Sequence, residues 1–283
     1  MRLIDGKLVA KAIREEIKQK VAEAYELYGK RFSLTVIIAG EDSASQIYVR
    51  NKGKACEEVG IISDTVVLPE SVSQEEIEKI VTEKVKDENV DGILVQLPLP
   101  RHLDEKRILK LIPPEKDVDG FSDSNVGRLT LFSDDALYSC TPHGIIKLLE
   151  YYDIPLKGKH AVVIGRSNIV GKPMALMLLK NDCTVTICHS KTENLAEITR
   201  TADILVCAVG KKGFVTADMV KDGAVVIDAG INRVDGKIYG DVDFDEVNQK
   251  ASYITPVPGG VGPMTITMLL YNTYLAGIRK VNK

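Results

Sequence analysis

The stretch Ala161–Leu179, AVVIGRSNIVGKPMALMLL, carries the most specific local signal of the chain. Its first residues have the pattern of a buried parallel strand, and the turn between Gly165 and Gly171 leads into a helix whose first turn admits Pro173. Glycines let a phosphate approach the backbone, and a helix start offers N–H donors with a partial positive charge. The strict G-x-G-x-x-G spacing is absent, since Ser167 holds the middle position. The stretch predicts a nucleotide site, with an ordinary strand-to-helix turn as the alternative.

Three more short apolar runs follow this turn, at residues 185–188, 203–208 and 224–228. Helix-length or turn-rich segments separate them, which is the pattern of a doubly wound parallel sheet. Ligands of such sheets bind beyond the carboxyl ends of the strands. The residues expected at those ends are Gly165, Ser190, Val209, Gly210, Ala229, Gly230 and Ile231.

The composition is that of an ordinary globular chain. It has 283 residues, 45% hydrophobic and 27% charged, which is enough for two cores, and its net charge of −3 argues against nucleic acid as a partner. The start has no apolar signal segment and no stretch is long enough to span a membrane, so we expect a cytoplasmic protein. Its 5 cysteines form no C-x-x-C and are expected to be small buried residues, and its 4 histidines have no metal-ligand spacing, so we predict no metal.

The first half also alternates helices and strands. Asp5 is a candidate cap and Gly29 a stop for a helix over residues 5–28, a buried strand covers residues 33–39, and Asp42 opens a helix that runs to about Gly60. A strand at 65–68, a helix at about 73–87 and a strand at 92–96 complete this repeat. We therefore expect an N-terminal three-layer α/β catalytic domain, a C-terminal Rossmann-type dinucleotide-binding domain, and a cleft between them.

Prolines and glycines mark the boundaries of these domains. Four prolines between residues 98 and 114 precede an irregular loop at 116–120. A helix over about 141–152 then leads into the second domain. Near the C-terminus, the rigid loop 256–263 precedes a last helix over about 264–279. The expected domains are residues 1–140, joined by the returning segment 264–283, and residues 141–263.

Four polar residues are the candidate catalytic groups. Tyr48 and Lys52 stand at i and i+4 of one helix and share a face, although a surface tyrosine and a solvated lysine would have the same spacing. Gln96 ends a strand, and Asp119 lies in the proline-bounded loop, where capping an Asx turn is its alternative role. Convergence of these groups would make an active site.

Five motifs, in order, span nearly the whole chain: Tyr48-Val-Arg-Asn-Lys52, Val95-Gln-Leu-Pro-Leu-Pro100, Lys116-Asp-Val-Asp-Gly120, Gly165-Arg-Ser-x-x-Val-Gly-x-Pro173 and Pro258-Gly-Gly-Val-Gly-Pro-Met-Thr265. Together they resemble the bifunctional methylenetetrahydrofolate dehydrogenase/methenyltetrahydrofolate cyclohydrolase family. The resemblance is to the form that has no fused formate-activating synthetase. It implies oxidation of 5,10-methylenetetrahydrofolate with NADP, hydrolysis of the methenyl product to 10-formyltetrahydrofolate, and a homodimer.

The resemblance also implies the site residues. Lys52 would be the base, held by Gln96, with Tyr48 supplying an aromatic face and Asp119 accepting hydrogen bonds from the pterin. The substrate would contact Tyr48, Val49, Arg50, Asn51, Lys52, Val95, Gln96, Leu97, Asp119, Pro258, Gly259, Gly260, Val261 and Gly262. The cofactor would contact Gly165, Arg166, Ser167, Ser190 and Ile231.

Two other functions fit parts of this pattern. A Tyr-x-x-x-Lys pair beside a dinucleotide fold is typical of short-chain dehydrogenases, but there the pair follows the glycine-rich turn, whereas Tyr48 precedes Gly165 by more than a hundred residues. A non-catalytic dinucleotide-binding sensor would need the turn but not a lysine, a glutamine and an aspartate directed at one site.

The residues expected around the cofactor ribose favour NADP over NAD. An NAD site usually has an acidic residue that accepts a hydrogen bond from the ribose 2′-hydroxyl, and the segment Cys188-His-Ser-Lys191 has none. Arg166 lies in the glycine turn, where its guanidinium can bind a 2′-phosphate.

Overall fold

The computed structural model describes residues 2–40 and 43–281. The chain divides into two compact units, which we call unit 1 (Met1–Lys11 with Thr141–Thr265) and unit 2 (Ala12–Cys140 with Ile266–Lys283). None of the helices in the described ranges has the length and apolarity needed to cross a membrane.

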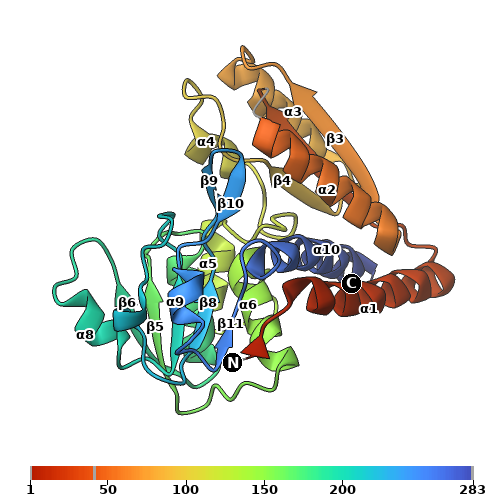
Figure 1. Cartoon of the computed structure of the whole chain (residues 1–283). Coiled ribbons are helices and arrows are strands. Elements are labelled where there is room, and N and C mark those ends of the chain that lie inside the picture. Colours follow the sequence, from red (N-terminus) through yellow and green to blue (C-terminus); the bar gives the residue numbers. More distant parts are fainter. Residues whose placement is uncertain (1, 41–42, 282–283) are drawn as a thin grey trace. The chain divides into compact units, whose positions relative to one another are not determined.

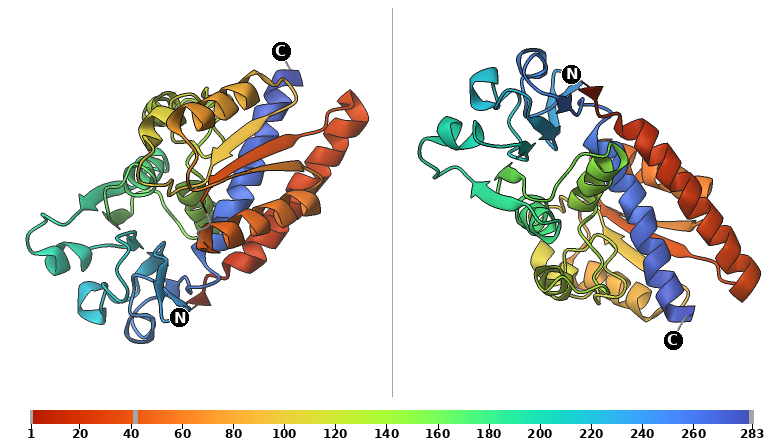
Figure 2. Two further views of the ribbon diagram at one scale, coloured as in Figure 1. Left: turned by 90° about the horizontal axis from the view of Figure 1, so that it is seen from above. Right: turned by 90° about the horizontal axis from the view of Figure 1, so that it is seen from below.

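Unit 2 contains a parallel sheet of three strands in the order β3-β2-β4. The strands are β2 (Ser33–Ala39), β3 (Ile62–Leu68) and β4 (Gly92–Val95). Alternate residues such as Ile37 and Ile93 pack on one face against α3 (Gln74–Lys86) and α4 (Glu105–Leu109). Helix α10 (Val261–Val281) covers the other face (Figure 2). The expected three-layer α/β arrangement is confirmed.

Helix ends in both units follow the local signals of the sequence. In α1 (Gly6–Tyr28) the Asp5 carboxylate accepts from the amides of Lys7 and Leu8 at 2.9 and 3.1 Å, and the amide of Gly29 closes the last turn. Ser73 forms a capping box with Glu76 at the start of α3. Helix α2 covers Ser43–Val59, and its predicted opening residue Asp42 lies outside the described residues.

Unit 1 is built on a six-stranded parallel sheet in the order β1-β11-β8-β7-β5-β6 (Figure 1). The strands are β1 (Arg2–Leu3), β5 (His160–Ile164), β6 (Thr184–Cys188), β7 (Ile204–Cys207), β8 (Val225–Asp228) and β11 (Tyr253–Ile254). From β5 the chain first goes to β6 on one side and then to β7 on the other. The strand order therefore reverses between β5 and β7, which is where doubly wound sheets bind their ligands.

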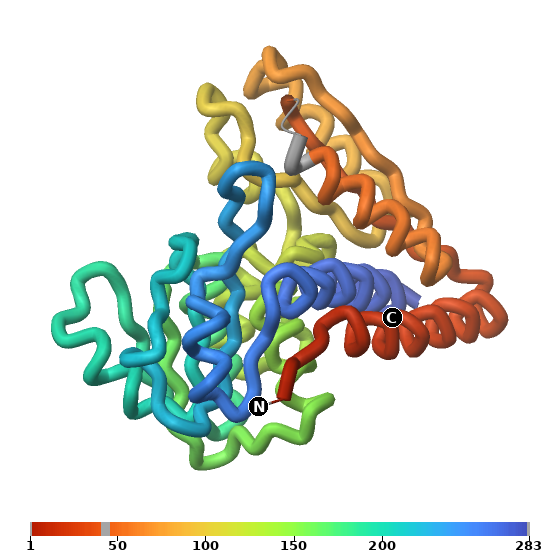
Figure 3. Tube along the Cα trace, in the orientation of Figure 1, coloured from red at the N-terminus to blue at the C-terminus, as the bar shows by residue number. Residues whose placement is uncertain are grey.

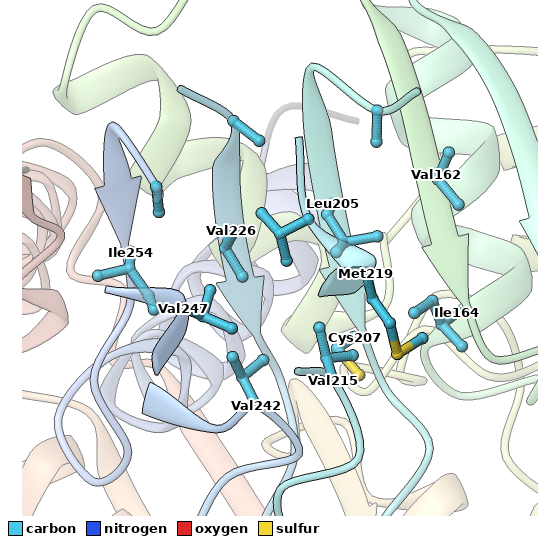
Figure 4. Packing of buried hydrophobic residues seen from close by; sticks show 14 of the residues in the cluster. Val162, Ile164, Leu205, Cys207, Val215, Met219, Val226, Val242, Val247 and Ile254 are labelled. Carbon is cyan, nitrogen blue, oxygen red and sulfur yellow. The ribbon is translucent and has the colours of Figure 1, made fainter. Parts of the chain in front are cut away.

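The core of unit 1 explains the strongly apolar strands. Val162, Leu205 and Val226 come from three neighbouring strands and pack with Met219 and Val247 (Figure 4). Strands covered on both faces need no polar alternation, so they appear as continuous apolar runs. The expectation for the cysteines is confirmed, because all five are buried and free.

The shorter elements complete both units. They are α5 (Asp123–Thr130), α6 (Cys140–Tyr151), α7 (Gly171–Lys180), α8 (Leu195–Thr199), α9 (Phe244–Val247), the 3₁₀ turn η1 (Ala217–Met219) and the antiparallel hairpin of β9 (Asn232–Val234) and β10 (Lys237–Tyr239). The hairpin projects as an arm from unit 1 (Figure 3). The predicted start of the last helix at Met264 is wrong, because α10 already begins at Val261 and its first turn tolerates Gly262 and Pro263.

Candidate active site

Lys52 and Gln96 form the best-defined contact among the predicted catalytic residues. Helix α2 places Tyr48 and Lys52 one turn apart on one face. The Lys52 side chain is buried, and its Nζ donates to Oε1 of Gln96 at 2.9 Å. The amide nitrogen of Gln96 donates to the carbonyl of Leu97 at 2.8 Å, so the amide oxygen is turned toward the lysine. The lysine is therefore neither solvated nor free to rotate.

Lys52 and Asp119 perturb each other electrostatically. Burial lowers the pKa of Lys52, and the negative charge of Asp119 acts in the opposite direction. Burial raises the pKa of Asp119 to about 6, although the charge of Lys52 opposes this shift. An amine made less basic and a carboxyl made less acidic, close together, are typical of sites that transfer protons near neutral pH.

Asp117 performs the loop-capping role that was the alternative reading of Asp119. Its carboxylate accepts from the amides of Gly120, Phe121 and Ser122 at 3.1, 3.2 and 2.7 Å and from the side chain of Asn125 at 2.9 Å. These bonds fix the loop that carries Asp119. Asp119 itself is left to interact with Lys52 and with the thiol of Cys140.

Several residues that support this loop were missed in the sequence. The Lys116 ammonium donates to the carbonyls of Val85 and Asp87 at 2.8 and 2.6 Å, at the C-terminal end of α3. The Asn272 amide on α10 donates to the carbonyls of Val118 and Tyr138, both at 2.8 Å. Only the fold brings these positions together, so no local pattern marks them.

Cys140 also belongs to this site. Its thiol donates to the Val118 carbonyl at 3.3 Å, and burial raises its pKa well above the usual value, so it is a neutral thiol. Cys140 was predicted only to be a small buried residue.

The remaining residues of the two N-terminal motifs differ in exposure. Val49 is buried, whereas Arg50 and Asn51 are exposed. At about 100° per residue, Arg50 lies on the side of α2 opposite Tyr48. Val95 is buried within β4 and Leu97 is partly buried. Their substrate contacts stay predictions.

The segment Pro258–Gly262 belongs to unit 1. A Cβ atom on Gly260 would lie 2.6 Å from the Pro256 carbonyl oxygen, and one on Gly6 would lie 1.7 Å from the carbonyl oxygen of Gly260. The tight turn of the loop on Pro256 thus explains Gly260 without a ligand, and packing of the loop on the start of α1 explains Gly6. Val261 is already helical, while Pro258 is exposed. Folate contacts of this segment stay a prediction.

The nucleotide turn in unit 1 requires both of its glycines. A Cβ on Gly165 would lie 2.4 Å from the carbonyl oxygen of Ala208, and one on Gly171 would lie 2.3 Å from that of Gly165. The expected donation of helix amides to a phosphate is partly replaced by an internal cap: the Ser167 hydroxyl accepts from the amides of Val170 and Gly171 at 3.1 and 3.3 Å. The exposed side chains of the turn, above all that of Arg166, can therefore bind an anion.

The strand register places two predicted cofactor residues close together. Ile164 and Cys188 are paired across β5 and β6, so Arg166 and Ser190 each follow by two residues at the same edge of the sheet. Both are exposed, as is Ile231 beyond β8. This edge can hold a phosphorylated ribose, because it offers a guanidinium and a hydroxyl.

Two α/β units, one with a buried lysine opposite a carboxyl group and the other with a glycine turn at the switch point of its sheet, define a two-domain dinucleotide-binding enzyme. A model of the tetrahydrofolate dehydrogenase/cyclohydrolase catalytic domain matches residues 4–119, and a model of the NAD(P)-binding domain of the same proteins matches residues 139–281. The chain belongs to the tetrahydrofolate dehydrogenase/cyclohydrolase family.

Relatives match over almost their whole length. The bifunctional protein FolD of Moorella thermoacetica is 56% identical over 98% of this chain and 99% of its own. The crystal structure of the bifunctional FolD enzyme of Campylobacter jejuni has a TM-score of 0.96 at 50% identity, covering 99% of both chains. That of Trypanosoma brucei, complexed with NADP and an inhibitor, has a TM-score of 0.95 at 41% identity, covering 99% and 98%. These matches favour the family over the short-chain dehydrogenase and the sensor.

Proposed function

We propose that this protein oxidises 5,10-methylenetetrahydrofolate to the 5,10-methenyl cation with NADP and hydrolyses that cation to 10-formyltetrahydrofolate. Family membership over nearly the whole chain supports both activities. The observation that carries the hydrolytic step is the buried Lys52, bonded to Gln96 and next to Asp119.

Unit 1 fits the cofactor. Gly165 and Gly171 let the backbone come close, Arg166, Ser167 and Ser190 would hold the phosphates, and Ile231 offers an apolar contact. The nicotinamide of a bound NADP would supply the acceptor for the hydride that leaves the methylene carbon of the folate. A cleft between the two domains, which this transfer calls for, stays a prediction.

In the hydrolytic step, Lys52 acts as base and then as acid. Water attacks the methenyl carbon while the neutral amine of Lys52 takes one of its protons. When the bond from that carbon to N5 breaks, the lysine returns this proton to N5, and the second proton of the water leaves to solvent. Burial and the positive charge of the substrate both favour the neutral amine, which is what a base requires.

Asp119 and Tyr48 would hold the substrate. An ionised Asp119 can accept hydrogen bonds from the ring N–H and the exocyclic amine of the pterin. The partly exposed ring of Tyr48, on the same face of α2 as Lys52, offers an aromatic surface to the folate.

The direct test mixes the purified protein with methylenetetrahydrofolate and NADP. We expect reduced cofactor to form, and, in a second assay, methenyltetrahydrofolate added alone to be hydrolysed faster than in buffer. Absence of both reactions in a folded protein would refute the proposal.

We also propose a cytoplasmic homodimer that uses neither nucleic acid nor membrane as a partner. The family resemblance supports the dimer, and the net charge of −3 argues against nucleic acid. Light scattering after size exclusion measures the mass of the assembly, and a monomeric mass would contradict the dimer.

A further inference from the structure

The loop that follows β7 lies at the reversal of strand order in unit 1. Strands β5 and β7 are hydrogen-bonded neighbours, and the loops after them flank the crevice that such a sheet offers to a dinucleotide. The two loops touch, because Gly165 packs against the carbonyl oxygen of Ala208. The segment Val209–Lys211 therefore forms one wall of the expected cofactor site.

A buried carboxylate, Asp241, fixes this segment. Its Oδ2 accepts from the amides of Val209 and Gly210 at 2.6 and 2.9 Å, and its Oδ1 accepts from the amide of Lys211 at 2.8 Å. Three consecutive amides that end on one carboxylate leave the loop little freedom.

The same carboxylate also ties down a second segment. Oδ1 of Asp241 accepts from the side chain of Asn232 at 2.8 Å, where the arm of β9 and β10 begins. The backbone of Asp241 is also held in place, because its amide donates to Oδ1 of Asp228, at the end of β8, at 2.9 Å. One fully buried residue thus joins the ends of β7 and β8 to the arm, through its carboxylate and its backbone amide.

We propose that Asp241 is a positioning residue for the nicotinamide dinucleotide. It holds the Val209–Lys211 wall in place before the cofactor binds, so that binding does not include the entropy cost of ordering this loop. This inference rests on the proposed function. An unliganded loop that is already fixed binds more tightly, because the entropy of ordering is lost on folding and not on binding.

The test is Asp241→Asn, which keeps the volume but directs an NH₂ group at the loop amides. We expect the KM for NADP to rise at least about tenfold, as loss of charge-assisted bonds implies. The kcat of oxidation and the hydrolysis of methenyltetrahydrofolate should stay near their original values, because Lys52, Gln96 and Asp119 belong to unit 2. Asp243→Asn is the matched control, since that carboxylate caps α9 by accepting from the amide of Glu246.

An unchanged KM for NADP in folded Asp241→Asn would overturn the proposal, and so would an equal fall of both activities, which indicates a merely structural role. If Asp241→Asn does not fold, the KM for NADP of a second variant, Asn232→Ala, tests the proposal. It removes one partner of Asp241 and should raise the KM for NADP by a smaller factor, whereas an unchanged value refutes the idea. Failure of the proposed function differs from both, because the unmodified protein would then not reduce NADP.

Discussion

The Nζ atom of Lys52 lies 2.9 Å from Oε1 of Gln96, and the other end of the same amide is fixed by the Leu97 carbonyl. Gln96 can only accept from the lysine in this orientation, so it holds the amine without taking its proton. A lysine used only for solubility would extend into water, whereas Lys52 is 9% exposed. This contact gives the first prediction its direction.

Lys52→Met should abolish most of the cyclohydrolase activity and leave the fold intact. Loss of a general acid/base typically costs about 100-fold to 10,000-fold in rate. Replacing a buried ammonium by a thioether should not reduce the melting temperature, since the charge is disfavoured there. Methenyltetrahydrofolate hydrolysis measures the effect, and Lys54→Met, exposed on the same helix, is the control. Full activity of folded Lys52→Met would exclude Lys52 as the base.

Asp119→Ala should depress both activities together, because both need the pterin to be held. The KM for the folate substrate should rise in both assays. Loss of only one activity would mean that Asp119 takes part in chemistry and not in binding.

The hydrolytic reaction should weaken in mild acid. Burial raises the pKa of Asp119 to about 6, so its carboxylate is mostly ionised at pH 7 and mostly protonated at pH 5. We expect kcat/KM to fall by about tenfold or more between these values once uncatalysed hydrolysis is subtracted, and protonation of Lys52 adds to the fall. In Asp119→Asn, the part of this fall in kcat/KM that comes from protonation of Asp119 should disappear. A pH profile that is the same in the variant would contradict this assignment.

The same shift has a consequence for stability, of opposite sign to the usual acid effect. Between its unfolded pKa of 3.8 and its folded pKa of about 6, Asp119 binds more proton in the native state. Its contribution to the free energy of unfolding therefore falls as the pH rises through this range. Asp119→Asn should accordingly be more stable than the unmodified protein above pH 6, which urea unfolding at several pH values measures.

Lys116 gives a prediction that concerns stability alone. Its ammonium bonds the Val85 and Asp87 carbonyls at the end of α3, and its side chain is buried. Lys116→Met should lower the free energy of unfolding by about 1–3 kcal/mol, because two partly buried carbonyls lose a charged donor. Lys86 is exposed on α3, so Lys86→Met is the control. A loss within about 0.5 kcal/mol would be typical of a surface site and would contradict this role.

The parts of the fold that depend on local signals were predictable. Asp5, Gly29 and Ser73 mark helix ends through bonds to residues within a few positions, and the apolar runs of β5 and β7 need no partner to be recognised. The strands β1 and β11 were not, because each has two residues and is defined only by its partners: β1 pairs with β11 across nearly the whole chain, and β11 pairs also with β8. Two residues cannot show a periodicity.

The candidate site divides in the same way. Spacing alone puts Tyr48 and Lys52 on one face, and the contact of Lys52 with Gln96 follows from where a strand ends. Nothing local distinguishes Asp117 from Asp119, since both lie in one short loop and only the fold turns the first toward backbone amides. Cys140 and Asp241 become visible only when distant segments meet.

The last prediction concerns the choice of cofactor. The exposed Arg166 and Ser190 follow the paired residues Ile164 and Cys188 at one edge of the sheet, and no carboxylate lies in the segment 188–191 to accept a ribose hydroxyl. A charge-assisted bond from the guanidinium to a 2′-phosphate is worth about 1.5–3 kcal/mol. Arg166→Ala should therefore raise the KM for NADP by about 10-fold to 100-fold and leave that for NAD nearly unchanged. Lys172→Ala, on the first turn of α7, is the control for loss of a nearby positive charge. An equal effect on both cofactors, or efficient use of NAD by the unmodified protein, would show that Arg166 does not read the 2′-phosphate.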